Sequence, residues 1–250
     1  MKKYIFLISL FLVKVDLFAQ QSQLNIPGGV QVNFADNPAQ GEGVTTIKIL
    51  LILTLLTVAP AIILAMTSFT RVVIVLSFTR QALGTQSLPP NQIIVGLSLF
   101  ITFFIMGPTF AQINDNALQP YIDGKIQRTE FLKKASDPLK KFMFAQVYEE
   151  DLKLFLSHSG TKVKPKNLED LSLRIIIPAF ITSEIKRGFQ MGFMIFIPFI
   201  VLDIIVASIL MSMGMMMLPP AIISLPLKIM LFVLVNGWDL IIGSLLKSFA

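Results

Sequence analysis

Residues 188–220 read GFQMGFMIFIPFIVLDIIVASILMSMGMMMLPP, and this stretch decides the fold. Its apolar part, residues 188–213, is longer than the roughly 20 residues that a helix needs to cross a bilayer. Pro198 and Asp203 interrupt this apolar block, and Pro219 and Pro220 stop the helix after it. Three further apolar blocks cover residues 47–66, 93–106 and 227–246. Each block is short, broken by proline or charged, which predicts an all-α, membrane-associated protein with irregular spanning helices.

The overall composition excludes most enzyme chemistry. Hydrophobic residues make up 54% of the 250 residues and charged residues 14%, well below the quarter that is typical of soluble domains. There is no Cys, and His158 is the single His, so thiolate sites, most catalytic triads and His-based metal sites are excluded. We therefore expect no enzyme, no catalytic residue, no metal and no cofactor. The net charge of +6 is mixed in sign along the polar region, so nucleic acid is not expected as a partner.

The order of polar and apolar segments predicts five regions. Residues 1–19 have the charged start and short apolar core of a signal peptide, with an uncleaved anchor as the alternative. Residues 20–43 are polar and contain Pro and Gly, which is typical of a flexible linker. Two hydrophobic helical hairpins, 44–108 and 183–250, then flank an amphipathic helical region, 109–182.

The leader and the positive-inside rule predict the same orientation. A signal peptide exports the N-terminus that follows it, so the first apolar block should run inward. The short loop 67–91 carries Arg71 and Arg80 and no acidic residue, as a cytoplasmic loop should. The polar region 109–182 is then extracytoplasmic, and the methionine-rich turn lies on the cytoplasmic side.

Charged and small residues in the apolar blocks are candidates for helix packing and assembly. A carboxylate such as Asp203 costs about 2.5–3.5 kcal/mol at a helix centre, so we expect it to be paired, most simply with Lys228. Glu184 and the GxxxG of Gly188 and Gly192 share a helix face with Asp203. The pair is either part of an ion relay or an assembly salt bridge, and the absence of further titratable groups in that block favours the salt bridge.

Arg71 and Arg80 stand nine residues apart, in two copies of the motif SFTR. Nine residues correspond to two and a half helical turns, so these side chains should leave opposite sides of one helix. We expect a helix contacted from both sides by buried-charge partners, or two contacts with lipid headgroups.

The last set of candidates is a methionine cluster that follows no helical period: Met211, Met213, Met215, Met216 and Met217. Gly214 loosens the backbone inside the cluster, and Pro219 ends it. Long, flexible thioether side chains can close an aqueous path and deform around whatever passes. We predict a pore seal here, and ordinary core packing is the alternative.

Residues 66–108, 142–155 and 178–238 closely resemble the FliP family of export-gate proteins of flagellar type III secretion, which is related to the injectisome export apparatus. The quoted motifs include MTSFTRVVIVLSFTRQALGTQSLPPNQ, FMFAQVYEEDLKLF and LVNGW. The leader favours the flagellar branch. At position 236, where this chain has Asn, the resemblance leads us to expect Asp.

The resemblance implies a helical ring of several copies with FliQ and FliR, at the flagellar basal body in the bacterial inner membrane. Such a ring, together with other export-apparatus membrane proteins and lipids, would admit unfolded polypeptide substrates. It would sit largely above the membrane plane, with neighbouring subunits satisfying the polar groups of the broken helices, and the methionines would supply one layer of a gasket.

The residues leave one rival function open. An ion channel or secondary transporter could use Asp203 and Lys228 as an intramembrane charge pair, together with the two arginines. It would carry flux as the purified protein alone, whereas an export gate would need its partners.

Overall fold

The computed structural model describes residues 23–26, 30–33, 42–85, 88–159, 171–215 and 217–249. The chain divides into two compact units, Met1–Ala59 and Pro60–Ala250. The predicted signal peptide (1–19) and Met216 lie outside the described residues, as does most of the predicted linker.

The first unit contains a β-hairpin and most of one helix. Strand β1 (Gln23–Ile26) pairs in antiparallel register with β2 (Val30–Asn33), so that Ile26 lies opposite Val30. Both strands fall inside the segment that the sequence predicts to be a linker. Helix α2 (Glu42–Ala65) follows and continues through Pro60 beyond the end of the unit. Most of its leucines are exposed, and Leu64 is half-buried.

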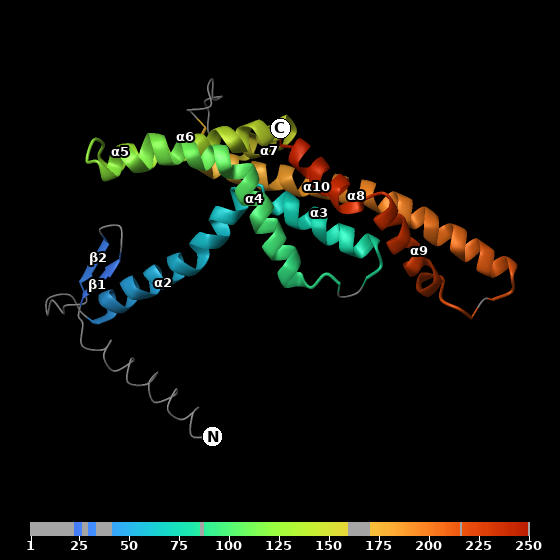
Figure 1. The fold of residues 1–250 in the computed structure, drawn as a ribbon. Helices are drawn as coiled ribbons and strands as arrows, with labels where there is room; N and C mark the ends of the chain where they lie inside the picture. Colours follow the sequence, from blue (N-terminus) through green and yellow to red (C-terminus); the bar gives the residue numbers. More distant parts are fainter. Residues whose placement is uncertain are drawn as a thin grey trace. The chain divides into compact units, whose positions relative to one another are not determined.

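The second unit is a helical assembly, and helices dominate the described residues as the sequence predicts. Along the chain its elements are α3 (Phe69–Ala82), α4 (Asn91–Ile113), the π-helix η1 (Asn114–Leu118), α5 (Gln119–Ile122), α6 (Arg128–Gln146), α7 (Glu149–His158), α8 (Leu173–Ser212), α9 (Pro220–Leu234) and α10 (Gly237–Lys247). Helices α6 and α7 pack along the first half of α8, and α9 packs along its second half (Figure 1). Helix α10 then leads from α9 back towards α3 and α6.

Two hydrophobic clusters hold the second unit together. The larger cluster joins α3, α4, α8, α9 and α10 through buried residues that include Val75, Leu76, Ile101, Phe199 and Leu245. The smaller cluster packs Met143 of α6 against Ile176 and Phe180 of α8. Aliphatic and aromatic side chains at helical spacing therefore bury the seams between helices.

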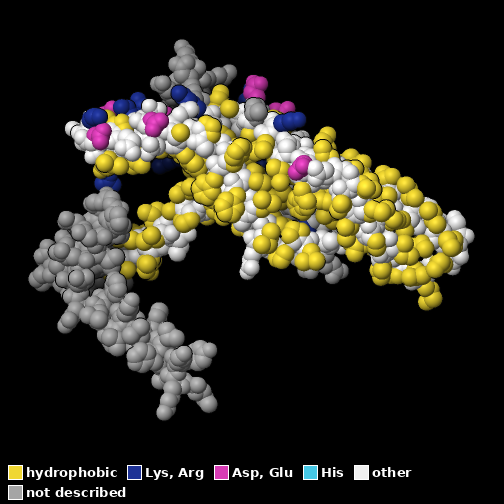
Figure 2. Space-filling view, viewed as in Figure 1, with side chains coloured by type: hydrophobic (Ala, Val, Ile, Leu, Met, Phe, Trp, Pro, Cys, Tyr) yellow, Lys and Arg dark blue, Asp and Glu magenta, His cyan; other side chains and the backbone are white. Residues whose placement is uncertain are grey.

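Apolar and charged surfaces are separated along the second unit. Hydrophobic side chains cover most of the visible surface of α8 and α9, and acidic and basic side chains gather over α5, α6 and α7 (Figure 2). Two helical stretches, Asn91–Ile122 and Leu173–Ser212, are long and apolar enough to cross a membrane. Two bent pairs also pass the same test when each is taken together: Ile49–Ala65 with Phe69–Ala82, and Pro220–Leu234 with Gly237–Lys247, the latter bent by 63°.

Prolines lie inside two of these helices without ending them. Helix α4 continues through Pro108, and α8 continues through Pro178 and Pro198. The predicted boundaries at 108/109 and 182/183 therefore fall inside helices. A proline removes one backbone hydrogen bond and kinks a helix, and packing on both sides can maintain the helix across that gap.

Candidate functional site

A fully buried ion pair lies where α3, α6, α8 and the C-terminal residues meet. Arg71 Nε donates to Glu184 Oε2 at 3.0 Å, and Arg71 Nη2 donates to Glu184 Oε1, with no exposed surface on either side chain. Nη2 also donates to Gln146 Oε1 at 3.0 Å. Nη1 donates to both the carbonyl oxygen and the hydroxyl of Ser248, each at 2.9 Å. All five N–H donors of the guanidinium are thereby used.

The same guanidinium fixes the C-terminal end of the chain. Arg71 Cζ lies 3.7 Å from the ring centroid of Phe249, which in turn stacks on Phe142 of α6. Cation–π contact and hydrogen bonds to Ser248 together bind the end of α10 to α3. The Arg71 cluster therefore joins four chain segments: α3, α6, α8 and the residues after α10.

A second polar group continues from this pair towards α7. Gln146 accepts a hydrogen bond from Arg187 Nη1 at 2.7 Å, and the Arg187 guanidinium lies over the ring of Tyr148. The buried Asp151 carboxylate accepts hydrogen bonds from Ser183 Oγ at 2.7 Å and from Lys186 Nζ. These bonds attach α6 and α7 to the first half of α8. At the exposed start of α7, a hydrogen bond from Lys153 lowers the pKa of the Glu149 carboxyl.

The two glycines of the GxxxG motif lie against α3 of the same chain. A Cβ on Gly188 would lie 3.0 Å from Ile74 Cγ2, and a Cβ on Gly192 would lie 2.6 Å from Phe78 Cγ. Arg71 contacts Glu184, Ile74 lies against Gly188, and Phe78 lies against Gly192. Residue numbers rise together along the two helices, so α3 and α8 are parallel neighbours. Glycine is required where side chains approach this closely.

Asp203 and Lys228 pair between α8 and α9. Lys228 Nζ lies 2.7 Å from Asp203 Oδ2, and Ser224 Oγ donates to Asp203 Oδ1 at 2.6 Å. The lysine side chain is 8% exposed, whereas that of Asp203 is 41% exposed. Both carboxylate oxygens therefore have partners inside the chain, and one edge of the carboxylate still faces outward.

Arg80 is separate from this pair and from Arg71. Its Nη1 donates to Asn91 Oδ1 at 2.5 Å and to the carbonyl oxygen of Pro89 at 3.3 Å, and so holds the turn between α3 and α4. The two arginines of the SFTR motifs thus have different partners: Arg71 joins helices in the interior, and Arg80 fixes a turn.

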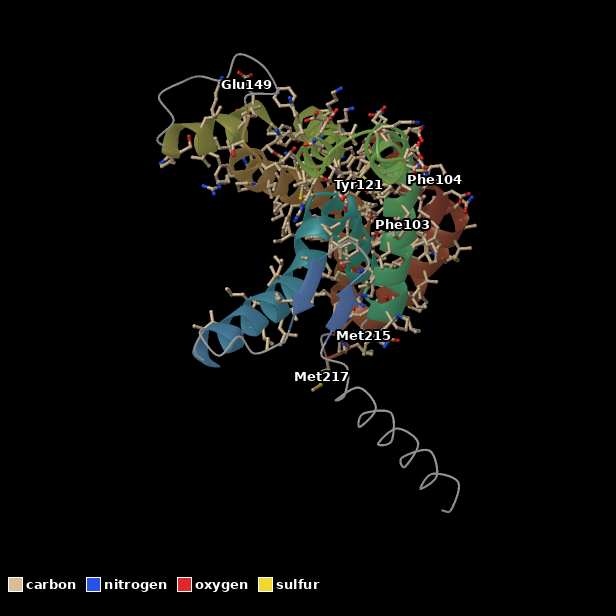
Figure 3. The ribbon with its side chains drawn as sticks, turned by 90° about the vertical axis from the view of Figure 1, so that its left-hand side faces the viewer. Phe103, Phe104, Tyr121, Glu149, Met215 and Met217 are labelled. Atoms are coloured by element: carbon tan, nitrogen blue, oxygen red, sulfur yellow. The ribbon has the colours of Figure 1, made fainter. Side chains whose placement is uncertain are left out.

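The methionine cluster begins at the end of α8 and extends into the turn before α9. Met211 is the last methionine in the helix, Met213 caps it, and Gly214 adopts a φ of +75°. Met211, Met213 and Met215 are exposed, and Met217 is 99% exposed. Met215 and Met217 lie far from Glu149 of α7 (Figure 3). The described methionines of this cluster therefore do not fill the core of this chain.

Sequence reasoning left one central feature unassigned. Arg71 and Glu184 were each candidates for buried charge, but nothing in their spacing identified them as partners, because 113 residues separate them. The signal that was available is a charged side chain inside a largely apolar helix. The roles of Gln146 and Ser248 carry no such signal, since neither is charged.

Among the described residues, no group of three or more His, Asp or Glu side chains is arranged to hold a metal ion. The polar clusters consist of ion pairs and hydrogen bonds that link helices.

Comparison with known proteins identifies the family of this chain. The family model described as "FliP family" matches residues 52–245. The chain is 57% identical to the flagellar biosynthetic protein FliP of Bacillus subtilis (strain 168) over 205 residues, covering 82% of this chain and 92% of that protein. It is 50% identical to FliP of Aquifex aeolicus (strain VF5), covering 84% and 89%, and 46% identical to FliP of Borreliella burgdorferi, covering 93% of each chain. The chain is therefore a member of the FliP family of flagellar biosynthetic proteins, a family of structural export components and not of enzymes.

Proposed function

We propose that this protein is a core subunit of the flagellar type III export gate, forming with further copies of itself and with FliQ and FliR a pore for unfolded substrates. The proposal locates the assembly in the bacterial inner membrane at the basal body, with other export-apparatus membrane proteins and lipids around it. The observation that carries it is the methionine turn at the end of α8, where the chain's own core leaves Met213, Met215 and Met217 uncovered.

A ring of such turns would form a seal. Several copies would bring flexible apolar side chains together around a central axis, where they exclude water at rest and deform around a passing polypeptide. Gly214 and Pro219 keep the turn out of regular helix packing, so it can move without disturbing α8 or α9. A seal of this kind needs no recognition of substrate sequence.

Exposed apolar helix faces support assembly with neighbours. Phe103 and Phe104 project from α4 (Figure 3), and Phe104 is 73% exposed. Apolar surface of this extent is typical of surfaces that meet lipid or other subunits. The internal polar clusters would keep each subunit rigid, since Arg71 and Glu184 make their hydrogen bonds to residues of the same chain.

The experiment compares pore leakage with assembly. The variant Met213→Ala/Met215→Ala/Met217→Ala removes long side chains from a turn that is not core, so the complex with FliQ and FliR should still form. Membranes containing it should leak ions at rest. The assays are bilayer conductance and the mass of the detergent-extracted complex. Full assembly without leakage would refute the seal, and absence of other copies, FliQ and FliR from the wild-type complex would refute the gate.

The rival function, an ion channel or secondary transporter, would use Asp203 and Lys228 as a relay. Ser224 and Lys228 occupy both oxygens of the Asp203 carboxylate, which favours a structural pair. Substrate-dependent flux through vesicles containing the purified chain alone, abolished by Asp203→Asn, would support the transporter instead.

A further inference from the structure

An apolar groove opens between α3, α8, α9 and α10 in the second unit. Its volume is about 480 Å³, within the range of sites that hold a small ligand. Hydrocarbon and thioether side chains form its walls, including Val75, Met194, Phe199 and Leu240, and Ser244 is the one polar side chain in its lining. We call this feature the α8–α10 groove. Its occupant must be a chain that needs no hydrogen bonds along its length.

The Ser244 end of the groove lies where the apolar helices meet the polar helix α6. One turn beyond Ser244, the Ser248 carbonyl binds Arg71 and the Phe249 ring stacks on Phe142 of α6. The residues after α10 therefore pack beside α6. From Ser244 the groove extends along α10 to Val235 at the end of α9, away from α6. A membrane interface would therefore coincide with one end of the groove.

The charged side chain of Lys247 lies at the Ser244 end of the groove. Lys247 follows Ser244 by three residues, so both side chains leave α10 on the same side. Lys247 is exposed, and within the described part of the chain it has no hydrogen-bond or ion-pair partner. An ammonium group at the polar end of an apolar groove is complementary to an anion attached to a hydrocarbon chain.

We propose that the α8–α10 groove binds one acyl chain of an anionic phospholipid, whose phosphate contacts Lys247 Nζ and Ser244 Oγ. The hydrocarbon tail fits walls that offer no polar partner, and the headgroup fits the charged end. A helix of another subunit can also fill apolar walls, but only a phospholipid brings a fixed anion to the charged end of the groove. The inference is independent of the export-gate function.

The single tryptophan of the sequence, Trp238, stands beside this groove and lines a neighbouring cavity with Leu97 and Ile242, so the variants below are needed to assign its quenching to the groove. It follows Gly237, which lines the groove, and its ring lies 5.3 Å from that of Phe232, another lining residue. The probes are phosphatidylglycerol and phosphatidylcholine, each brominated on the acyl chains, added to the full chain in vesicles of unbrominated phosphatidylcholine. Tryptophan fluorescence should be quenched at a lower mole fraction of brominated phosphatidylglycerol than of brominated phosphatidylcholine.

Matched variants separate the groove from general lipid contact. Lys247→Ala should reduce the preference for phosphatidylglycerol about five-fold, and Lys247→Arg should retain it. Val235→Phe narrows the groove and should weaken quenching by both lipids. The control is Val201→Phe, the same change on α8 outside the groove, at a similar exposure of 49% against 47%.

Three results would overturn the proposal. These are equal quenching by the two lipids in the wild-type chain, an unchanged preference in Lys247→Ala, or equal effects of the two Val→Phe changes. Quenching that falls for both lipids as the protein-to-lipid ratio rises would assign the groove to a second copy of the chain.

Discussion

Removal of the Glu184 carboxylate should strongly destabilise the second unit. In Glu184→Ala, Arg71 keeps its charge but loses the acceptor of two of its five N–H donors. The remaining acceptors, on Gln146 and Ser248, are neutral, and the guanidinium has no exposed surface through which water could reach it. Breaking a buried pair in this way costs about 3–5 kcal/mol.

The loss should be visible as a lower unfolding temperature. For a chain of this size, each kcal/mol moves the midpoint by about 2–4 °C, so Glu184→Ala should unfold roughly 6–20 °C below the wild-type chain. The fluorescence of Trp238, followed during heating of the detergent-solubilised protein, measures this midpoint. Glu184→Gln keeps one of the two oxygen acceptors but loses the charge and the second acceptor, so its midpoint should fall between those of the wild-type chain and Glu184→Ala.

The matched control is an exposed pair in the same unit. Glu149 and Lys153 lie 2.6 Å apart on α7 with most of each side chain in solvent, so Glu149→Ala should leave the midpoint nearly unchanged. The double variant Arg71→Met/Glu184→Leu leaves no unpaired charge and should be more stable than Glu184→Ala. If Glu184→Ala lowers the midpoint no more than Glu149→Ala, the assignment of this pair as the central polar contact is wrong.

Three further predictions concern helix packing and a turn. Gly192→Leu should separate α3 from α8, because even a Cβ at this position would lie 2.6 Å from Phe78. The thermal unfolding midpoint should fall strongly. Gly96→Ala is the control and should change the midpoint little, because no atom lies within 4 Å of its added Cβ. Asp203→Ala leaves Lys228 largely buried and unpaired, so the amount of assembled complex on a native gel should fall; normal assembly with lost export would favour the relay. Asn236 has a φ of 52°, so Asn236→Ala should cost about 1–2 kcal/mol in a chemical-denaturation assay and Asn236→Gly much less; equal losses would contradict the backbone explanation.

The same turn gives a physical account of the unexpected residue in LVNGW. Asn236 adopts the left-handed conformation between α9 and α10, which Asn tolerates better than most residues. Its Nδ2 donates to the Asp239 carboxylate, which a carboxylate at position 236 would repel. Asn is therefore compatible with the turn on both counts.

Helices and their apolar faces could be predicted from the sequence, because they depend on residues that are close together along the chain. Long apolar runs predicted the membrane-compatible helices, and apolar residues recurring near helical spacing among charged ones predicted the helices of the polar region. The helix period placed Glu184, Gly188 and Gly192 on one face, and the structure buries all three against α3. The methionines around Gly214 do not follow the helical period, and this predicted a turn after the helix.

Hydropathy alone gave the wrong extent for some helices. Residue 108 looked like an end because an apolar block stops there at a proline. The helix nevertheless continues, because hydrogen bonds before and after Pro108 and packing against α6 outweigh the one bond that proline removes. Whether a proline kinks or ends a helix depends on contacts that are distant in sequence.

The sequence by itself determined which segments are helical and apolar, which residues carry charge inside them, and where the methionines interrupt the pattern. Only the tertiary structure decided that Arg71 pairs with Glu184, that Ser248 and Phe249 contact the same guanidinium, and that α8 and α10 leave a groove between them. The reason is physical: helix formation and hydropathy follow from residues within a few turns, whereas the partner of a buried charge is chosen by the packing of whole helices.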